Sequence, residues 1–231
     1  MSTQADALYD RRLEAARVTK GTSSAEIYRM LLCAASGVIK PDDRLLEFGA
    51  GTGILAGMLK NSGFRGALTC ADILSKPIDI GADVRWIEGD LNEPLPVADS
   101  AFDCIVSTEV IEHLENARAA FREFRRLLRP GGALLLTTPN QESLRSLLAL
   151  ALRGHFVAFL EGSYPAHVTA LLRMDLVRLC AEHGFDHPRF CFTNAGGIPA
   201  MPRVSWQQIS FGMLKGRLFS DNLGLVSHKI A

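Results

Sequence analysis

A glycine-rich segment at residues 47–53, E-F-G-A-G-T-G, has the composition of a ligand-binding turn. It follows a short apolar stretch and precedes a helical one. Its glycines therefore permit a tight turn and let backbone N–H groups approach a ligand at a helix N-terminus. The spacing is G-x-G-x-G, since Ile54 stands where G-x-G-x-x-G needs its last glycine, and no G-K-[ST] of a P-loop follows. The segment predicts a ligand-binding loop that differs from both of these motifs.

Two aspartates follow the next two predicted strands. Asp72 ends the second strand, where a ribose diol would lie in a sheet of this topology. Asp90 follows the third strand and could accept a hydrogen bond from the exocyclic amine of adenine. Either aspartate could instead cap a helix N-terminus. Their order after the glycine loop favours the ligand-binding interpretation.

A cluster of acids and a histidine follows the fourth predicted strand, where the active sites of open parallel sheets form. On a helical turn Glu109 shares a face with Glu112 or with His113. Two carboxylates and an imidazole could bind a divalent cation if a further ligand arrives, and His167 could be that ligand. Alternatively, Glu112 stabilises the N-terminus of the helix that begins near Asn116, and His113 packs beneath a bound ligand. We predict no metal here and keep these four residues as alternative ligands.

His167 is the main candidate for a general base. It is a polar residue just before the predicted helix at 170–183, on the substrate side of the site. An imidazole with a near-neutral pKa suits removal of a proton from an acceptor hydroxyl. A histidine at a helix N-terminus with no catalytic part is the alternative, and His155 is a weaker candidate for the same task.

The elements that position these residues alternate between strand and helix. Buried strands are expected over residues 44–48, 67–71, 84–87, 102–107 and 133–138, and helices over 55–61, 73–80 and 117–128. Short strands that are apolar on both faces and alternate with helices indicate a parallel sheet covered on both sides. The sequence therefore predicts a doubly wound α/β fold.

The alternation ends after residue 139. Residues 144–160 are hydrophobic with a break at Arg153-Gly154, and they could form a lid over the site, a homodimer interface or a membrane-surface segment, in that order. We divide the single domain 1–231 into N-terminal helices (1–40), a binding core (41–142), an acceptor-side insertion (143–217) and a final strand (218–231).

Composition excludes several classes of protein. The 231 residues are 48% hydrophobic and carry 25 basic and 25 acidic side chains, which argues against both a disordered chain and a bulk nucleic-acid binder. No apolar run approaches the ~18 residues of a membrane helix. Residues 1–12 lack the apolar segment of a secretory signal, and the five cysteines show no C-x-x-C spacing. We expect a cytoplasmic protein.

These motifs together resemble those of class I S-adenosylmethionine-dependent methyltransferases. The resemblance covers residues 43–140 and rests on E-F-G-A-G-T-G, the acid after the second strand, G-D-L after the third, F-D-C-I-V-S-T-E-V-I-E-H-L and L-R-P-G-G-A-L-L-L-T-T-P-N. It implies a Rossmann-like sheet of seven strands whose last strand, 218–229, is antiparallel between its neighbours. The residues it assigns to the cofactor are Glu47, Phe48, Gly49, Ala50, Gly51, Gly53, Asp72, Ile73, Asp90, Leu91, Ser107 and Glu109.

The resemblance also implies a reaction. The predicted activity is transfer of a methyl group from S-adenosylmethionine to an oxygen, and in second place a nitrogen, of a small-molecule, sugar or lipid-precursor acceptor, with His167 and His113 as the catalytic residues. The E-V-I-E-H segment with a later histidine also resembles the metal site of small-RNA 3′-terminal 2′-O-methyltransferases, although the neutral charge counts against RNA. A non-catalytic cofactor-binding subunit is the remaining alternative.

Overall fold

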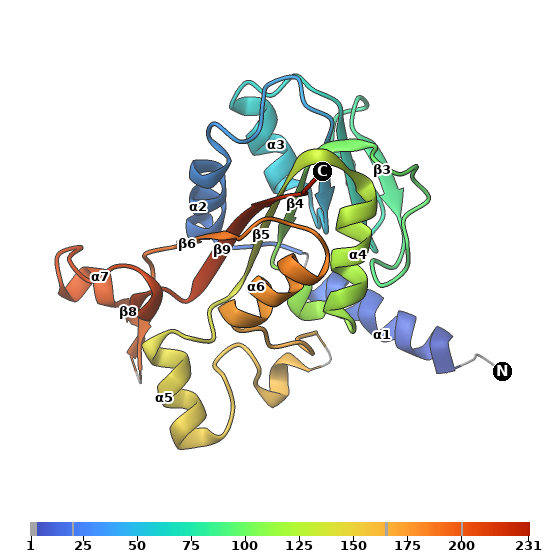
Figure 1. Ribbon diagram of the computed structural model, residues 1–231. Helices are drawn as coiled ribbons and strands as arrows, with labels where there is room; N and C mark the ends of the chain where they lie inside the picture. Colours follow the sequence, from blue (N-terminus) through green and yellow to red (C-terminus); the bar gives the residue numbers. More distant parts are fainter. Residues whose placement is uncertain (1–3, 20, 165, 200) are drawn as a thin grey trace.

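A seven-stranded sheet with the order β3-β2-β1-β4-β5-β9-β6 forms the centre of the molecule (Figure 1). The computed structural model describes residues 4–19, 21–164, 166–199 and 201–231. The first three of residues 1–12, which the secretory-signal prediction concerns, lie outside the described residues. The strands are β1 (Leu45–Phe48), β2 (Leu68–Asp72), β3 (Arg85–Glu88), β4 (Phe102–Thr108), β5 (Leu128–Pro139), β6 (Arg189–Phe192) and β9 (Asn222–His228). Only β9 runs antiparallel to its neighbours in this sheet, β5 and β6. The predicted fold is confirmed.

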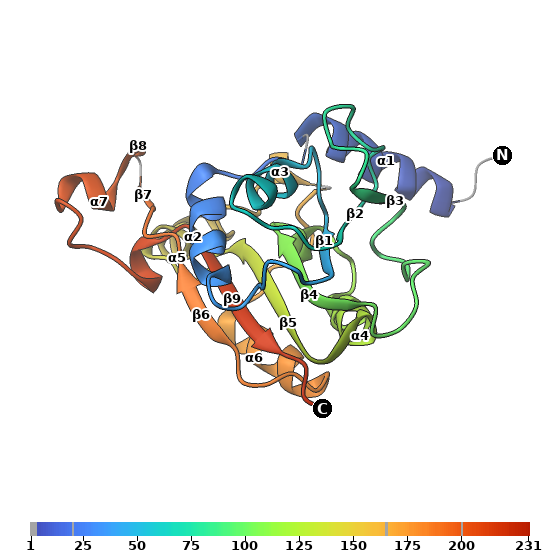
Figure 2. The same cartoon turned by 90° about the horizontal axis from the view of Figure 1, so that it is seen from above.

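Helices cover both faces of this sheet (Figure 2). One face carries α2 (Ala25–Ala35) and α3 (Ile54–Asn61), and the other carries α4 (Ala117–Leu127) and α6 (Arg173–Glu182). Successive strand residues point to opposite faces, so Leu45 packs with α2 and α3 while Leu46 packs with α4 and α6. Because both faces are covered, β1 is buried at all four of its residues, Glu47 included.

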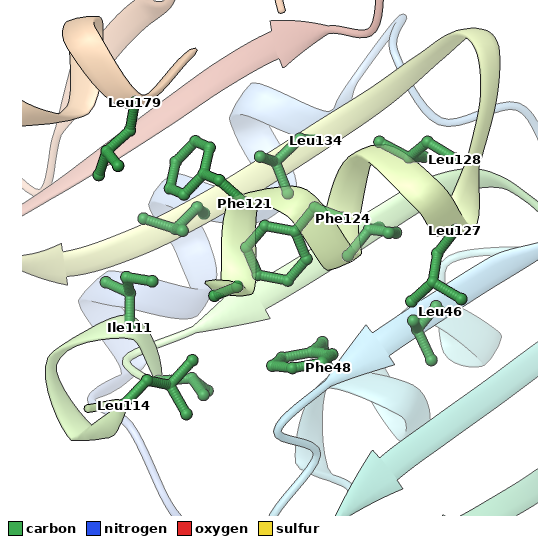
Figure 3. Packing of buried hydrophobic residues seen from close by; sticks show 14 of the residues in the cluster. Leu46, Phe48, Ile111, Leu114, Phe121, Phe124, Leu127, Leu128, Leu134 and Leu179 are labelled. Atoms are coloured by element: carbon green, nitrogen blue, oxygen red, sulfur yellow. The ribbon is translucent and has the colours of Figure 1, made fainter. Parts of the chain in front are cut away.

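The helix α4 shows how one face is built. Asn116 caps its N-terminus by accepting a hydrogen bond from the Ala119 N–H, and an apolar stripe then recurs at helical spacing. From that stripe Phe121 and Phe124 are fully buried, and the Phe124 ring meets the Phe48 ring of β1 edge to face at 5.0 Å between centroids (Figure 3). This packing fixes the end of β1, from which the glycine loop begins.

A peripheral region after β5 stands apart from the sheet, which β6 and β9 join and which α6 covers (Figure 1). Its elements are α5 (Leu144–Arg153), a short hairpin of β7 (Gly197–Ile198) and β8 (Met201–Ser205), and α7 (Trp206–Ile209). The expected break after Arg153 is present, because Gly154 ends α5 in a left-handed conformation. No helix among the described residues has the length and apolarity that crossing a membrane requires.

The helix expected over residues 73–80 is wrong. The Asp72 carboxylate accepts a hydrogen bond from the Leu74 N–H, which starts a turn, and Pro77 has no N–H to offer a helix. The indole N–H of Trp86 on β3 donates to the Leu74 carbonyl, and the Lys76 ammonium donates to the carbonyls of two later residues. The segment is a loop fixed by side-chain hydrogen bonds, which a local apolar pattern does not reveal.

Candidate active site

A cavity of 350 Å³ opens where the parallel strands end. Gly49 after β1, Asp72 at the end of β2 and Thr108 at the end of β4 line it, and the loop after β3 adds Asp90. The carboxyl ends of β1 and β4 flank the point where the strand order reverses, which is where open α/β sheets bind ligands. Sequence order alone therefore placed the two aspartates and the glycine loop in one cavity.

The glycine loop requires glycine at two positions. Gly49 has φ of 85°, and a Cβ there would lie 2.2 Å from a methyl carbon of Val110. Gly51 has φ of 53°, and a Cβ there would lie 2.2 Å from the Gly21 carbonyl oxygen. Both conformations disfavour other residues, and both sites have backbone or side chain in contact distance. The loop is thus held between Val110, which precedes the short 3-10 helix η1 (Ile111–His113), and Gly21, which follows α1 (Gln4–Thr19).

Asp72 ties this loop to the sheet. One oxygen of its carboxylate accepts the Gly51 N–H at 2.7 Å, and the other accepts the Leu74 N–H at 2.8 Å. Burial raises the pKa of this carboxyl, and the two backbone N–H groups oppose that rise. Each oxygen keeps a lone pair for a ligand hydroxyl. Ile73 lines the cavity beside it.

Asp90 meets a residue that sequence reasoning missed. Arg12 of α1 donates to one oxygen of Asp90 and also pairs with Glu115, and the Asn92 N–H donates to the other Asp90 oxygen at 2.9 Å. Arg12 lines the cavity together with Leu91. No sequence signal points to Arg12, because it is one of several charged residues on a polar helix and lies 78 positions from its partner.

Several predicted cofactor residues lie beneath the cavity and do not line it. Phe48 is in the core, Ser107 is fully buried, and Glu47 is 3.7 Å from the Cys70 sulfur, which donates to it. Burial raises the pKa of Glu47 to about 8. Ala50 packs in the core on the α3 side, and Gly53 begins α3 in a left-handed conformation. These residues shape the loop from below.

Two acids lie at the other end of the cavity, Glu112 fully buried and Glu109 half-buried. Glu109 accepts hydrogen bonds from the Thr137 hydroxyl at 2.9 Å and the Asn222 amide at 2.7 Å, and burial raises its pKa to about 7. Glu112 accepts the Thr138 hydroxyl at 3.2 Å through Oε2, while its Oε1 has no hydrogen-bond partner among the described residues. Burial first, and then the Glu109 charge, raise the pKa of Glu112 well above its usual value.

The two predicted catalytic histidines meet at these acids. The rings of His113 and His167 lie 4.8 Å apart between centroids, and both line the cavity. The segment that carries His167 is held by Glu112, whose carbonyl accepts the N–H groups of Val168 and Thr169. Burial lowers the pKa of His113.

The remaining histidine candidate and the apolar insertion lie outside this group. His155 does not line the cavity, and its Nδ1 lies 3.2 Å from the Phe156 carbonyl. Residues 144–160 contribute no lining residue, but the Ala158 carbonyl contacts the His167 ring at 2.6 Å. Residues 144–160 therefore contact the site through a backbone carbonyl, that of Ala158, which orients the His167 ring.

Comparison with known proteins identifies the class. A family model described as "Methyltransferase domain" matches residues 22–187, which span the sheet strands β1 to β5 and the cavity. With the seven-stranded sheet and the glycine loop, the chain belongs to this family and is a class I S-adenosylmethionine-dependent methyltransferase. The family predicted from residues 43–140 is confirmed.

Individual relatives carry out different methylations. The ubiquinone/menaquinone biosynthesis C-methyltransferase UbiE of Laribacter hongkongensis is 32% identical over 193 residues, 74% of this chain and 78% of the relative. The malonyl-[acyl-carrier protein] O-methyltransferase of Serratia marcescens is 32% identical over 152 residues, 64% of this chain and 55% of the relative.

A solved structure supports the fold. The 1,6-didemethyltoxoflavin-N1-methyltransferase of Burkholderia thailandensis, with its substrate and S-adenosylhomocysteine bound, aligns with a TM-score of 0.65 at 13% identity, covering 100% of this chain and 92% of that one. C-, O- and N-methylation by name thus occur among proteins similar to this chain.

Proposed function

We propose that this enzyme transfers a methyl group from S-adenosylmethionine to an oxygen, and in second place a nitrogen, of a small-molecule acceptor such as a sugar or lipid precursor. One observation carries the proposal: a single continuous cavity has the glycine loop and Asp72 at one end and the paired rings of His113 and His167 at the other. Basic ring nitrogens beside the transfer path suit an acceptor that must lose a proton, as a hydroxyl must.

The loop end fits the groups of the cofactor. In this proposal the lone pairs of Asp72 receive the ribose hydroxyls, and Asp90 with Leu91 receives the adenine. In this proposal the backbone of the glycine loop, of which Gly49 lines the cavity, holds the methionine part. The buried Thr108 hydroxyl has no partner among the described residues, which leaves it free for a polar group of the ligand.

Methyl transfer depends more on the orientation of the acceptor and the methyl group than on charged side chains near the sulfur. S-adenosylmethionine supplies a methyl group on a positively charged sulfur, and that charge is lost during transfer. Strong anionic contact with the sulfur would therefore favour the ground state, so Asp72 and Asp90 act by binding and orienting. The walls exclude water and hold the acceptor oxygen in line with the methyl group. The ring nitrogen Nε2 of His167 can take the hydroxyl proton.

Binding of the demethylated cofactor tests the loop assignment. Calorimetric titration of S-adenosylhomocysteine should show at least a tenfold loss of affinity for Asp72→Ala. The exposed Asp79→Ala is the matched control and should bind like the parent protein. An Asp72→Ala affinity within about twofold, which is ~0.4 kcal/mol, would contradict the ribose assignment. Circular dichroism checks that the variant is folded.

A labelling experiment tests the acceptor class. The purified protein is incubated with methyl-labelled S-adenosylmethionine and a fractionated bacterial extract. We expect the label in a small organic or sugar-containing fraction, attached through oxygen. Label confined to RNA or protein would overturn the small-molecule proposal.

A further inference from the structure

Three side chains at the acceptor end of the cavity offer metal-ligating atoms to one point. Glu112, His113 and His167 each provide one such atom, and these atoms all lie within 4.8 Å of one another. A point between three atoms so spaced lies at most about 2.8 Å from each, so side-chain shifts below ~1 Å reach the ~2.1 Å of a zinc–nitrogen bond. Two imidazoles and a carboxylate are a donor set found in catalytic metal sites.

Both imidazoles are held by a backbone carbonyl at Nδ1. Nδ1 of His113 lies 2.7 Å from the Ala166 carbonyl, and Nδ1 of His167 lies 2.6 Å from the Ala158 carbonyl. A carbonyl can only accept, so each Nδ1 must carry the proton, and in the neutral ring Nε2 then carries the lone pair. A backbone carbonyl on the far nitrogen is also the usual way in which proteins orient a metal-binding histidine.

Glu112 supplies the second, independent observation. Its side chain is 0% exposed, it lines the cavity, and its Oε1 has no hydrogen-bond partner in the described part of the chain. Glu109 near it is half-buried, and no lysine or arginine among the described residues forms an ion pair with either acid. A buried carboxylate oxygen without donor or counter-charge is costly unless a ligand satisfies it.

We propose that Glu112, His113 and His167 bind one divalent transition-metal cation that takes part in positioning the acceptor. Nitrogen-rich donors select zinc, cobalt, nickel or iron(II) over magnesium and calcium, which prefer oxygen. Glu109 lies outside this group of three, and its two oxygens accept hydrogen bonds from Thr137 and Asn222. The sequence interpretation of four alternative ligands is thereby reduced to three.

The catalytic consequence rests on the proposed function. An acceptor hydroxyl that coordinates the cation has a lowered pKa and releases its proton to water. The acceptor oxygen then forms a bond to the methyl carbon, the carbon–sulfur bond breaks, and its electron pair stays on sulfur as the neutral thioether. In the cation-loaded enzyme His167 is a ligand, and the proton no longer needs to pass to its ring.

Cobalt(II) is the probe for this site, because its visible absorption reports ligation directly. The full chain is treated with chelator, desalted and titrated with CoCl₂, followed by absorption and by calorimetry. We expect one cobalt per chain with visible bands that zinc removes by competition. His167→Ala and Glu112→Gln should each weaken cobalt binding by at least about 100-fold, more than the 10- to 100-fold typical of outer-sphere changes.

Controls separate this site from surface binding and from misfolding. The exposed His187→Ala should titrate like the parent protein. Glu112→Gln should keep or raise the Tm of the metal-free protein, because a neutral amide replaces a buried carboxyl that has an unpartnered oxygen and whose ionised form is disfavoured. Equal cobalt binding by the parent and both site variants would overturn the proposal, and so would an absence of visible bands in the parent.

A parallel titration with S-adenosylhomocysteine distinguishes the two proposals. Normal cofactor binding without cobalt binding would reject the cation site and leave the proposed function standing. Cobalt binding without cofactor binding would support the cation site and reject the proposed function. Binding of both, each lost in its own variant, supports both.

Discussion

The two ends of the cavity are built in different ways. The loop end is formed where successive strands end, with Gly49 after β1, Asp72 at the end of β2 and Asp90 after β3. Asp72 holds this end together by accepting hydrogen bonds from backbone N–H groups. The acceptor end joins η1 after β4 to the insertion, through the contact of His113 with the Ala166 carbonyl 53 positions away. One end is thus fixed by the sheet itself, whereas the other depends on where an added segment packs.

The two regions that carry these ends also differ in how many large apolar side chains they leave exposed. The sheet and α4 bury large apolar side chains such as Phe124, whereas the peripheral region around α5 and α7 leaves several exposed, with Phe211 at 93%. A scaffold of this kind can keep its cofactor site rigid while the acceptor region varies. The three predictions that follow test this contrast.

The largest effect is expected for the core. Phe124→Ala removes a fully buried ring between the α4 stripe and Phe48, and should lower the free energy of unfolding by about 3–5 kcal/mol. Phe211→Ala, the control from the acceptor region, should change it by less than about 0.5 kcal/mol. Urea unfolding measures both. Comparable losses for the two variants would mean that the acceptor region is as tightly packed as the sheet.

The next effect concerns the glycine loop. Gly51→Val places a branched side chain against the Gly21 carbonyl at a positive φ, so cofactor affinity should fall by at least about 100-fold, or ~2.7 kcal/mol. Gly57→Ala is the control, because a Cβ there meets nothing within 4 Å inside α3. It should leave binding unchanged and stabilise the protein by about 0.5–1 kcal/mol. Calorimetry with S-adenosylhomocysteine is the measurement, and tight binding by Gly51→Val would show that the loop is not a backbone cradle.

The smallest effect follows from the buried acid beneath the loop. Because burial raises the pKa of Glu47 to about 8, the native state holds its proton more tightly than the unfolded state does. The stability contributed by Glu47 is therefore full below about pH 4.5 and is lost as pH rises towards 8. The loss should be roughly 2 kcal/mol between pH 6 and pH 8.

Glu47→Gln isolates this contribution from those of Glu109 and Glu112, whose raised pKa values act in the same direction. Urea unfolding of parent and variant at several pH values gives the difference. Parallel pH profiles for the two proteins would show that Glu47 is already ionised in the folded chain.

Much of this protein can be predicted from its sequence. Apolar strands alternating with helices determine the doubly wound sheet, and the spacing of the glycines, Asp72 and Asp90 places them at one edge, because parallel strands end on the same side. These are local patterns combined with one topological rule. They also led to the family.

Only the tertiary structure decided the rest, because it depends on contacts between distant segments. Arg12 reaches Asp90 across 78 positions, and Asn222 holds Glu109 across 113. The loop over residues 73–80 is fixed by hydrogen bonds to distant partners, from the Lys76 ammonium to the Val84 carbonyl and from the Trp86 indole of β3 to the Leu74 carbonyl, which a local pattern does not reveal. The tautomers of His113 and His167 are set by carbonyls that become neighbours only after folding, and those contacts, invisible in the sequence, separate a cation site from an ordinary pair of histidines.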